Sequence, residues 1–203
     1  MRIALSIPIR DGGNWDHALQ FAVEAERMGA ASLWSREAWG YDAVTPLAFL
    51  AGRTSSIGLG TGIMQIGSRS PANVAMTATT LQSISGGRFM LGLGTSGPQV
   101  IEGWHGIPFD RPIQRTRELI EIVRLATSGN QVAYEGEIYQ LPLPGGEGRA
   151  LRSAAGESHV PIYVAALGPR NLELTGELAD GWMGGSFIPE TADVFIQHLR
   201  AGA

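Results

Sequence analysis

The sequence has no cysteine, no long run of one charge and no long apolar stretch. Without cysteine, the chain can form no disulfide, no thiolate metal site and no cysteine nucleophile. Its 15 basic and 19 acidic residues are interspersed, which argues against nucleic-acid and polybasic membrane-surface binding. No apolar run approaches the roughly 20 residues that cross a membrane, and the first residues lack a secretory pattern. We therefore expect a cytoplasmic protein that acts on a small molecule, with no nucleic-acid or membrane partner.

Short apolar runs alternate with segments of helical period, which is typical of βα units around a parallel sheet. Each expected helix begins near a proline or a capping residue and has an apolar stripe that should face the sheet. Met28 and Ile84 belong to these stripes. The expected strands are 2–9, 31–36, 57–64, 88–95, 161–167 and 181–185, and the expected helices are 14–29, 71–85, 112–128 and two that begin at Pro169 and Pro189.

Residues 130–160 interrupt this alternation. Tyr134, Ile138 and Tyr139 around Glu135-Gly136 indicate a small hairpin, and the rest is rich in glycine, serine and proline. A lid over a site and a disordered loop both fit this composition. We expect residues 1–203 to form a single α/β domain with a loop insertion at about 130–160. Its six βα units are two fewer than an ordinary eight-stranded barrel has.

Four expected strands end in stretches that are nearly free of side chains: "GTGI" (60–63), "GLGTSG" (92–97), "ALGP" (166–169) and "MGGS" (183–186). Ligands of parallel α/β folds lie at these C-terminal strand ends, where free backbone N–H groups can meet an anion or a polar ring. Tight turns and close helix packing are the alternative explanation. "GLGTSG" also fits a dinucleotide-binding fingerprint, but Pro98 follows and the next helix is expected only at about 112, which disfavours a Rossmann site.

An ordered set of blocks carries a resemblance to a known family. The blocks are "SLWSREAW", "AGRTSSIGLGTGI", "RSPANVAMTATTLQSISGGRFMLGLGTS", "GWHGIPFDRP", "YEGEIYQLP" and "PIYVAALGPRNLELTGELADGW". Together they resemble the luciferase-like monooxygenase superfamily, most closely the branch that uses the deazaflavin coenzyme F420. The resemblance implies a TIM-type (β/α)8 barrel, here truncated to about six βα units. F420, with FMN as the alternative, would lie at the C-terminal mouth of the strands.

The same resemblance implies a set of cofactor-binding residues. A cis peptide bond between Gly62 and Ile63, directly after Thr61, would form a bulge behind the ring of the cofactor. The remaining matches are Ser96 and Gln99 at the ring edge, Ala166, Leu167 and Gly168 at the phosphate, and Gly184, Gly185 and Ser186 as a second phosphate wall.

Glu37 and His105 are the candidates for catalysis. Glu37 ends the second strand, where many relatives have an acidic residue followed by histidine, but here Ala38 follows. A carboxyl group buried near an apolar ring would have a raised pKa and could exchange protons; a solvated or Arg36-paired carboxylate is the alternative. His105 could contact substrate or act as acid or base, or it could simply anchor its loop.

Four tryptophans are candidates for an aromatic pocket, and the four histidines are candidates for metal ligands. Trp39 and Trp104 could line an aromatic pocket, whereas Trp34 and Trp182 are expected to pack in the core. The four histidines lack metal-ligand spacing, so we expect no metal site.

Three functions remain open at this stage. The leading one is hydride transfer between F420 and a small alcohol, aldehyde or activated double bond. An FMN-dependent monooxygenase is the near neighbour. The third is a truncated relative that binds cofactor without turnover, or one half of an assembly, such as a homodimer, that closes its barrel with another chain.

Overall fold

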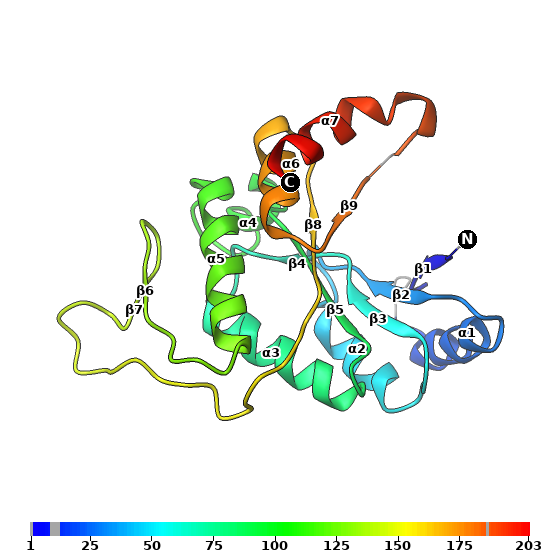
Figure 1. Cartoon of the computed structure of the whole chain (residues 1–203). Coiled ribbons are helices and arrows are strands. Elements are labelled where there is room, and N and C mark those ends of the chain that lie inside the picture. The colour runs from blue at the N-terminus through cyan, green and yellow to red at the C-terminus, as the bar shows by residue number, and fades with distance from the viewer. Residues whose placement is uncertain (1, 9–12, 186) are drawn as a thin grey trace.

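The computed structural model describes residues 2–8, 13–185 and 187–203. Its centre is a parallel sheet in the order β1-β2-β3-β5-β8-β9, with β4 pairing to β5 (Figure 1). Among the described strands, β1 pairs only with β2 and β9 only with β8. The strands are β1 Ala4–Ser6, β2 Ser32–Ser35, β3 Gly58–Thr61, β4 Met64–Gln65, β5 Phe89–Gly94, β8 Ile162–Ala165 and β9 Gly181–Met183, and β6 Tyr134–Glu135 and β7 Gln140–Leu141 form a separate antiparallel pair.

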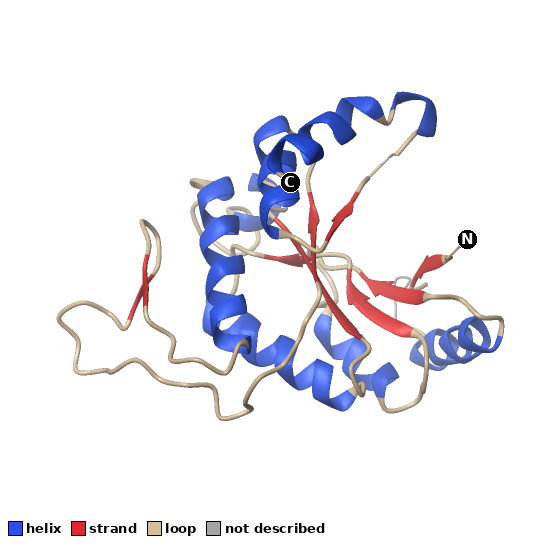
Figure 2. Cartoon of the chain, viewed as in Figure 1, coloured by secondary structure: helices blue, strands red, loops and turns tan. Residues whose placement is uncertain are grey.

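Helices cover one face of the curved sheet and leave the other face open, so the molecule is a half-barrel (Figure 2). The side chains that alternate outward from the strands, among them Leu33, Leu59, Leu91 and Val164, are fully or almost fully buried against this helical layer. None of the helices in the described ranges is long and apolar enough to cross a membrane. The helices are α1 Trp15–Arg27, α2 Val44–Ala51, α3 Pro71–Ile84, α4 Pro98–Ile101, α5 Pro112–Thr127, α6 Pro169–Leu178, the 3-10 helix η1 Pro189–Thr191 and α7 Asp193–Gly202.

The strand and helix pattern expected from the sequence is confirmed, with differences at the element ends. All six expected strands are present, although residue 9 lies outside the described ranges. Expected strand 57–64 divides into β3 and β4 at Gly62–Ile63. Met28 and Ile84 lie at the C-terminal ends of α1 and α3 and are 74% and 53% exposed, respectively. Their placement on the buried stripes was therefore wrong.

Two helices are missing from the sequence-based prediction. Helix α2 is eight residues long and apolar almost all round, so its periodicity does not separate it from a buried strand or loop. Asp42 Oδ1 accepts hydrogen bonds from the N–H groups of Val44 and Thr45, both at 2.8 Å. These bonds provide acceptors for N–H groups in the first turn of α2. Helix α4 begins at Pro98, directly after "GLGTSG", so the expectation of no helix before about 112 was wrong. With four residues, α4 still does not supply the long helix that a dinucleotide fingerprint requires.

The segment between α5 and β8 projects from the helical layer as an arm (Figure 1). Its hairpin, β6 and β7, is present as predicted, and Leu141–Pro142 is a cis peptide bond. The arm is fixed on α5 by Glu118, whose carboxylate accepts the N–H groups of Glu137 at 2.8 Å and Tyr139 at 2.8 Å. Gln82 of α3 donates to the carbonyl of His159. Because these contacts are with the outer helices, the arm does not have the position expected of a lid over the strand ends.

Candidate active site

The C-terminal ends of neighbouring strands bring most of the candidate residues to one edge of the sheet. Glu37 follows β2, Gly62 and Ile63 lie between β3 and β4, Ser96 follows β5, and residues 166–168 and 184–185 follow β8 and β9. Because these strands are parallel and adjacent, the segments lie next to one another in the order of the sheet. The expected gathering of bare strand ends is therefore present.

The glycines of β3 make room for an aromatic side chain on the open face. Register pairs Trp34 with Gly60, and a Cβ on Gly60 would lie 2.4 Å from the Trp34 ring. Trp34 also meets Tyr163 edge-on, with 5.4 Å between ring centroids. Trp34 therefore packs on the open face of the sheet, and the expectation that it lies in the core was wrong. At Gly60 the glycine is required by the tryptophan, and not directly by a ligand.

The peptide bond between Gly62 and Ile63 is cis, which confirms the linkage that the resemblance predicted. The bond separates β3 from β4 and re-aims the chain at the strand end. A Cβ on Gly62 would lie 3.2 Å from Met183 Cε and 3.3 Å from Trp34 Cβ, so a larger residue would have to displace one of these side chains. The surface beside Gly62 is therefore shared by its backbone and the side chains of Trp34 and Met183.

Thr61 has a structural task that the sequence did not reveal. Its hydroxyl accepts the N–H of Gly92 at 2.8 Å and donates to the carbonyl of Gly92 at 2.8 Å. The side chain is fully buried. These bonds continue the link between β3 and β5 after the last backbone register pair, Gly60 with Met90. The whole residue, backbone included, is 0% exposed, so the task of Thr61 is structural.

The Glu37 side chain is buried, and both of its carboxylate oxygens accept hydrogen bonds. Its carboxylate receives both guanidinium nitrogens of Arg69, at 2.6 and 2.8 Å, and the N–H of Ala43 at 3.0 Å. Burial opposes ionisation of Glu37, but these hydrogen bonds and the Arg69 charge outweigh it and lower the pKa below the ordinary 4.5. The expectation of a raised pKa was therefore wrong, and the paired cation is Arg69 instead of Arg36.

This pairing predicts how stability responds to acid. Since the folded-state pKa of Glu37 is lowered, the pair stabilises the fold above the unfolded-state pKa, and this contribution is lost as pH falls through the folded-state value. We expect Glu37→Gln to lower the free energy of unfolding at neutral pH by about 2–3 kcal/mol, because Arg69 is left half-buried without its counter-charge. Urea denaturation of both proteins at neutral and acidic pH measures this difference.

The matched control is Glu24→Gln, which breaks an exposed pair with Arg27. It should change stability much less than Glu37→Gln does, since exposed ion pairs contribute little. If the two variants behave alike, or if the stability gap between wild type and Glu37→Gln persists unchanged in acid, the Glu37–Arg69 pair does not have the importance given to it here.

His105 lies in the loop after α4, and its ring meets Gln65, a residue absent from the sequence-based site. Gln65 ends β4 and is 1% exposed. Its side-chain nitrogen lies 2.5 Å from Nε2 of His105, and its backbone N–H donates to Glu37 at 3.3 Å. Gln65 therefore connects the two residues proposed for catalysis. Neither Gln65 nor Arg69 forms a motif in the sequence; only their position after the third strand could have suggested them.

The segments matched to the cofactor phosphate are exposed at two neighbouring strand ends. Leu167 is 67% exposed and Gly168 is also exposed, whereas the Ala166 side chain is buried and its carbonyl accepts from Trp182. Gly168 is the N-cap of the ten-residue α6, and a Cβ at this position would meet no atom within 4 Å. Pro169 has no N–H, and the N–H groups of Asn171 and Leu172 donate to the Gly168 carbonyl at 3.1 and 3.0 Å. The Arg170 N–H and the dipole of the helix end are left for an anion.

On the second wall, Gly184 and Gly185 are exposed, and Ser186 lies outside the described residues. A Cβ on Gly184 would lie 2.6 Å from the Trp182 ring, which explains the glycine by packing. Trp182 packs on Phe195 with 5.2 Å between centroids, as expected for a core residue.

The remaining candidates lie beside the same edge, Gln99 in α4 and the others in the loops between elements. Ser96 has a left-handed backbone (φ 56°), and both Ser96 and Gln99 are exposed. Trp39 and Trp104 are 67% and 63% exposed, so neither is enclosed in a pocket within the described part of the chain. All four side chains are exposed to solvent.

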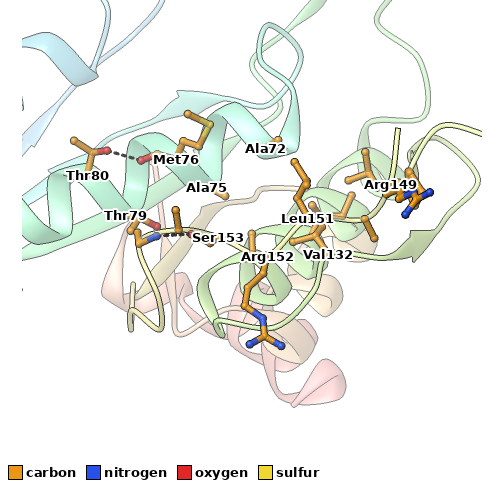
Figure 3. Close-up of a pocket in the computed structure, with 17 residues that line it drawn as sticks. Ala72, Ala75, Met76, Thr79, Thr80, Val132, Arg149, Leu151, Arg152 and Ser153 are labelled. Carbon is orange, nitrogen blue, oxygen red and sulfur yellow. Dashed lines mark hydrogen bonds between the residues drawn. The ribbon is translucent and has the colours of Figure 1, made fainter. Parts of the chain in front are cut away.

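A cavity lies elsewhere, between α3, α5 and the arm (Figure 3). It has a volume of about 510 Å³, and its walls include Ala75, Met76, Val132 and Leu151. Its lining is mostly apolar and belongs to the outer helical layer. The strand-end edge is the better candidate for chemistry, because charged and hydrogen-bonding groups from several strands converge there. Across the described ranges, no three histidine, aspartate or glutamate side chains come together as metal ligands.

A parallel barrel wall with bare, backbone-rich strand ends on its C-terminal side defines a class: (β/α)-barrel proteins that bind a small ligand at the strand ends. Within this class, the chain belongs to the luciferase-like monooxygenase family, whose family model matches residues 1–203. The fold and the family membership expected from the sequence are therefore confirmed.

Three relatives show which members of the family this chain resembles. The chain is 41% identical over 194 residues to a Mycobacterium tuberculosis protein provisionally named a coenzyme F420-dependent oxidoreductase, covering 92% of this chain and 56% of the relative. It is 35% identical to the 5,10-methylenetetrahydromethanopterin reductase of Methanolobus tindarius, covering 90% and 54%. The structure of the F420-dependent tetrahydromethanopterin reductase of Methanopyrus kandleri superimposes with a TM-score of 0.84 at 25% identity, covering 99% of this chain and 60% of that one. The chain thus spans little more than half the length of these relatives.

Proposed function

We propose that this protein is an F420-dependent oxidoreductase that moves a hydride between the cofactor and a small alcohol, aldehyde or activated double bond. The observation that carries the proposal is that side-chain-poor ends of β3, β5, β8 and β9 converge at one edge of the sheet, with the N-terminus of α6 at Gly168 among them. A planar ring needs a smooth wall, and its phosphate tail needs N–H donors. Gly62–Ile63 and Gly168 follow strands that lie on either side of β5. Relatives named for F420 use support this choice of ring.

Each part of the site has a distinct task under this proposal. Backbone at 62–63 supports one face of the ring, with buried Thr61 holding that segment on β5; Ser96 and Gln99 contact the ring edge, and residues 166–168 with 184–186 bind the phosphate tail. The deazaflavin supplies the hydride chemistry when bound. The Glu37 carboxylate already accepts hydrogen bonds from Arg69 and from the backbone N–H of Gln65, and it holds both in place. Glu37 is therefore a positioning group instead of the proton-transfer group first expected.

Binding experiments test the choice of cofactor. We expect purified protein to bind F420 more tightly than FMN in a fluorescence titration. Tighter FMN binding would indicate the monooxygenase chemistry of the family name. F420 binding without turnover of any alcohol, aldehyde or enoyl substrate would indicate a cofactor-binding relative, and binding of neither ring would overturn the proposal.

Substitution of Gly168 separates binding from folding. Gly168→Asp should leave the thermal midpoint unchanged or raise it, because aspartate is a favoured N-cap and its charge suits the helix dipole. The same charge should weaken F420 binding by roughly tenfold or more, since it repels the phosphate. Gly168→Asn is the matched control with a similar shape and no charge. Equal F420 affinity in the aspartate and asparagine variants would remove Gly168 from the phosphate site.

A further inference from the structure

Gln65 is a buried polar side chain that the proposed function leaves unexplained. Register pairs it with Gly94 of β5, whereas the preceding pair, Met64 with Leu93, lies in the hydrophobic core. Since neighbouring strand residues face opposite sides of a sheet, Gln65 faces away from the helical core. The sheet side that it faces is the one that carries the candidate active site.

Both ends of the Gln65 amide are buried, and only one has a partner. The nitrogen Nε2 lies 2.5 Å from His105 Nε2. No donor among the described residues reaches the oxygen Oε1. Reversing the amide would instead bury an NH₂ group without an acceptor, and an unpaired buried N–H is rarer in proteins than an under-satisfied carbonyl oxygen. The orientation with nitrogen toward the histidine is therefore favoured.

This orientation fixes the protonation pattern of the ring. An amide nitrogen can only donate, so the His105 Nε2 that it meets must accept, and a neutral imidazole then has its proton on Nδ1. We infer that Gln65 is a positioning residue that holds His105 as the neutral, Nδ1-protonated tautomer. The backbone bond from Gln65 to the Glu37–Arg69 pair fixes the position of the glutamine itself.

The tautomer limits what His105 can do, and this consequence rests on the proposed function. Nε2 is occupied by the amide and cannot accept a proton from substrate while that contact lasts. Loss of the Nδ1 proton from a neutral ring would leave an imidazolate, so the ring is a poor proton source. The remaining capacity is hydrogen-bond donation from Nδ1–H to an oxygen atom. We therefore assign His105 as an orienting donor to a carbonyl or hydroxyl oxygen of the substrate.

Nitrogen-detected NMR of ¹⁵N-labelled protein tests the tautomer without any cofactor. At alkaline pH, where a histidine ring is neutral, His105 should show a protonated Nδ1 and an unprotonated Nε2. His105→Asn identifies its signals among the four histidines by their disappearance. In Gln65→Met, which keeps the side-chain length without the amide, this fixed pattern should be lost. Circular dichroism melts establish that each variant is folded.

Two outcomes overturn the inference. One is a wild-type His105 protonated at Nε2, which would mean that the amide is reversed and that Nδ1 is the free base. The other is a folded Gln65→Met variant with the wild-type tautomer; if that variant fails to fold, the wild-type spectrum alone decides. In an active enzyme, Gln65→Met should lower kcat/KM by at least about tenfold with F420 affinity unchanged. Absence of turnover by wild type counts against the proposed function and leaves the tautomer result standing.

Discussion

Gly92→Ala is expected to lower the free energy of unfolding by about 3 kcal/mol. A Cβ at this position would lie 1.8 Å from the Thr61 carbonyl oxygen, and real Cβ atoms essentially never approach another atom within 3.0 Å. The neighbour is backbone, so no side-chain rotation relieves the overlap. The strands would have to separate where the Thr61 hydroxyl joins them through the N–H and carbonyl of Gly92. Urea denaturation followed by circular dichroism measures the change.

Gly97→Ala is the control for this prediction. It removes a glycine from the same bare stretch, but a Cβ there has no neighbour within 4 Å and the backbone φ of −148° is open to any residue. We expect a change below about 1 kcal/mol. Equal effects of the two substitutions would show that loss of glycine flexibility matters more than the close contact between β3 and β5.

Glu118→Gln is expected to release the arm from the body. The Glu118 carboxylate is fully buried and accepts from Gln114 Nε2 and from the backbone N–H groups of Glu137, Ile138 and Tyr139 at 2.8–3.0 Å. An amide offers one acceptor oxygen and turns an NH₂ group toward these donors. We expect hydrogen-exchange protection at residues 137–139 to fall by about a hundredfold, the equivalent of two bonds to a charged acceptor at the low end of their range.

The same carboxylate makes the arm sensitive to acid. Burial opposes its ionisation, but the four hydrogen bonds outweigh burial, so the pKa of Glu118 is lowered from 4.5. The attachment is therefore complete above the unfolded-state pKa and weakens as pH falls through the folded-state value. Glu137→Gln, in the same turn but with its side chain 72% exposed, is the control and should leave protection unchanged. Protection that is independent of Glu118 would mean that other contacts hold the hairpin.

The central architecture could be predicted because its signals are local. Most strands are short apolar runs, and α1, α3, α5 and α6 begin at a capping residue or a proline and have a buried stripe, such as Val74, Ala78 and Leu81 in α3. Helix α2 was missed since an apolar run of eight residues has no period to reveal its type. Met28 and Ile84 were misplaced since a stripe does not show where contact with the sheet ends.

The candidate site was predicted only in outline. Glycine at four strand ends indicated where a ligand would lie, and the resemblance supplied the cis bond at Gly62. The partner of Glu37 was wrong because ion pairing depends on distance in space: Arg36 is adjacent in sequence, but Arg69 reaches the carboxylate. Gln65 was missed because a single glutamine in a strand has no pattern, and its meaning comes from a histidine 40 residues away.

The sequence by itself determined the order of βα units, the family and the edge of the sheet where chemistry is expected. Spacing, apolar periodicity and glycine positions act within a few residues, and they survive in the unfolded chain. Only the tertiary structure decided which polar groups meet, including the Glu37–Arg69 pair, the Gln65–His105 contact and the Glu118 anchor of the arm. Those contacts join residues from separate elements, so their geometry exists only after the sheet has brought the elements together.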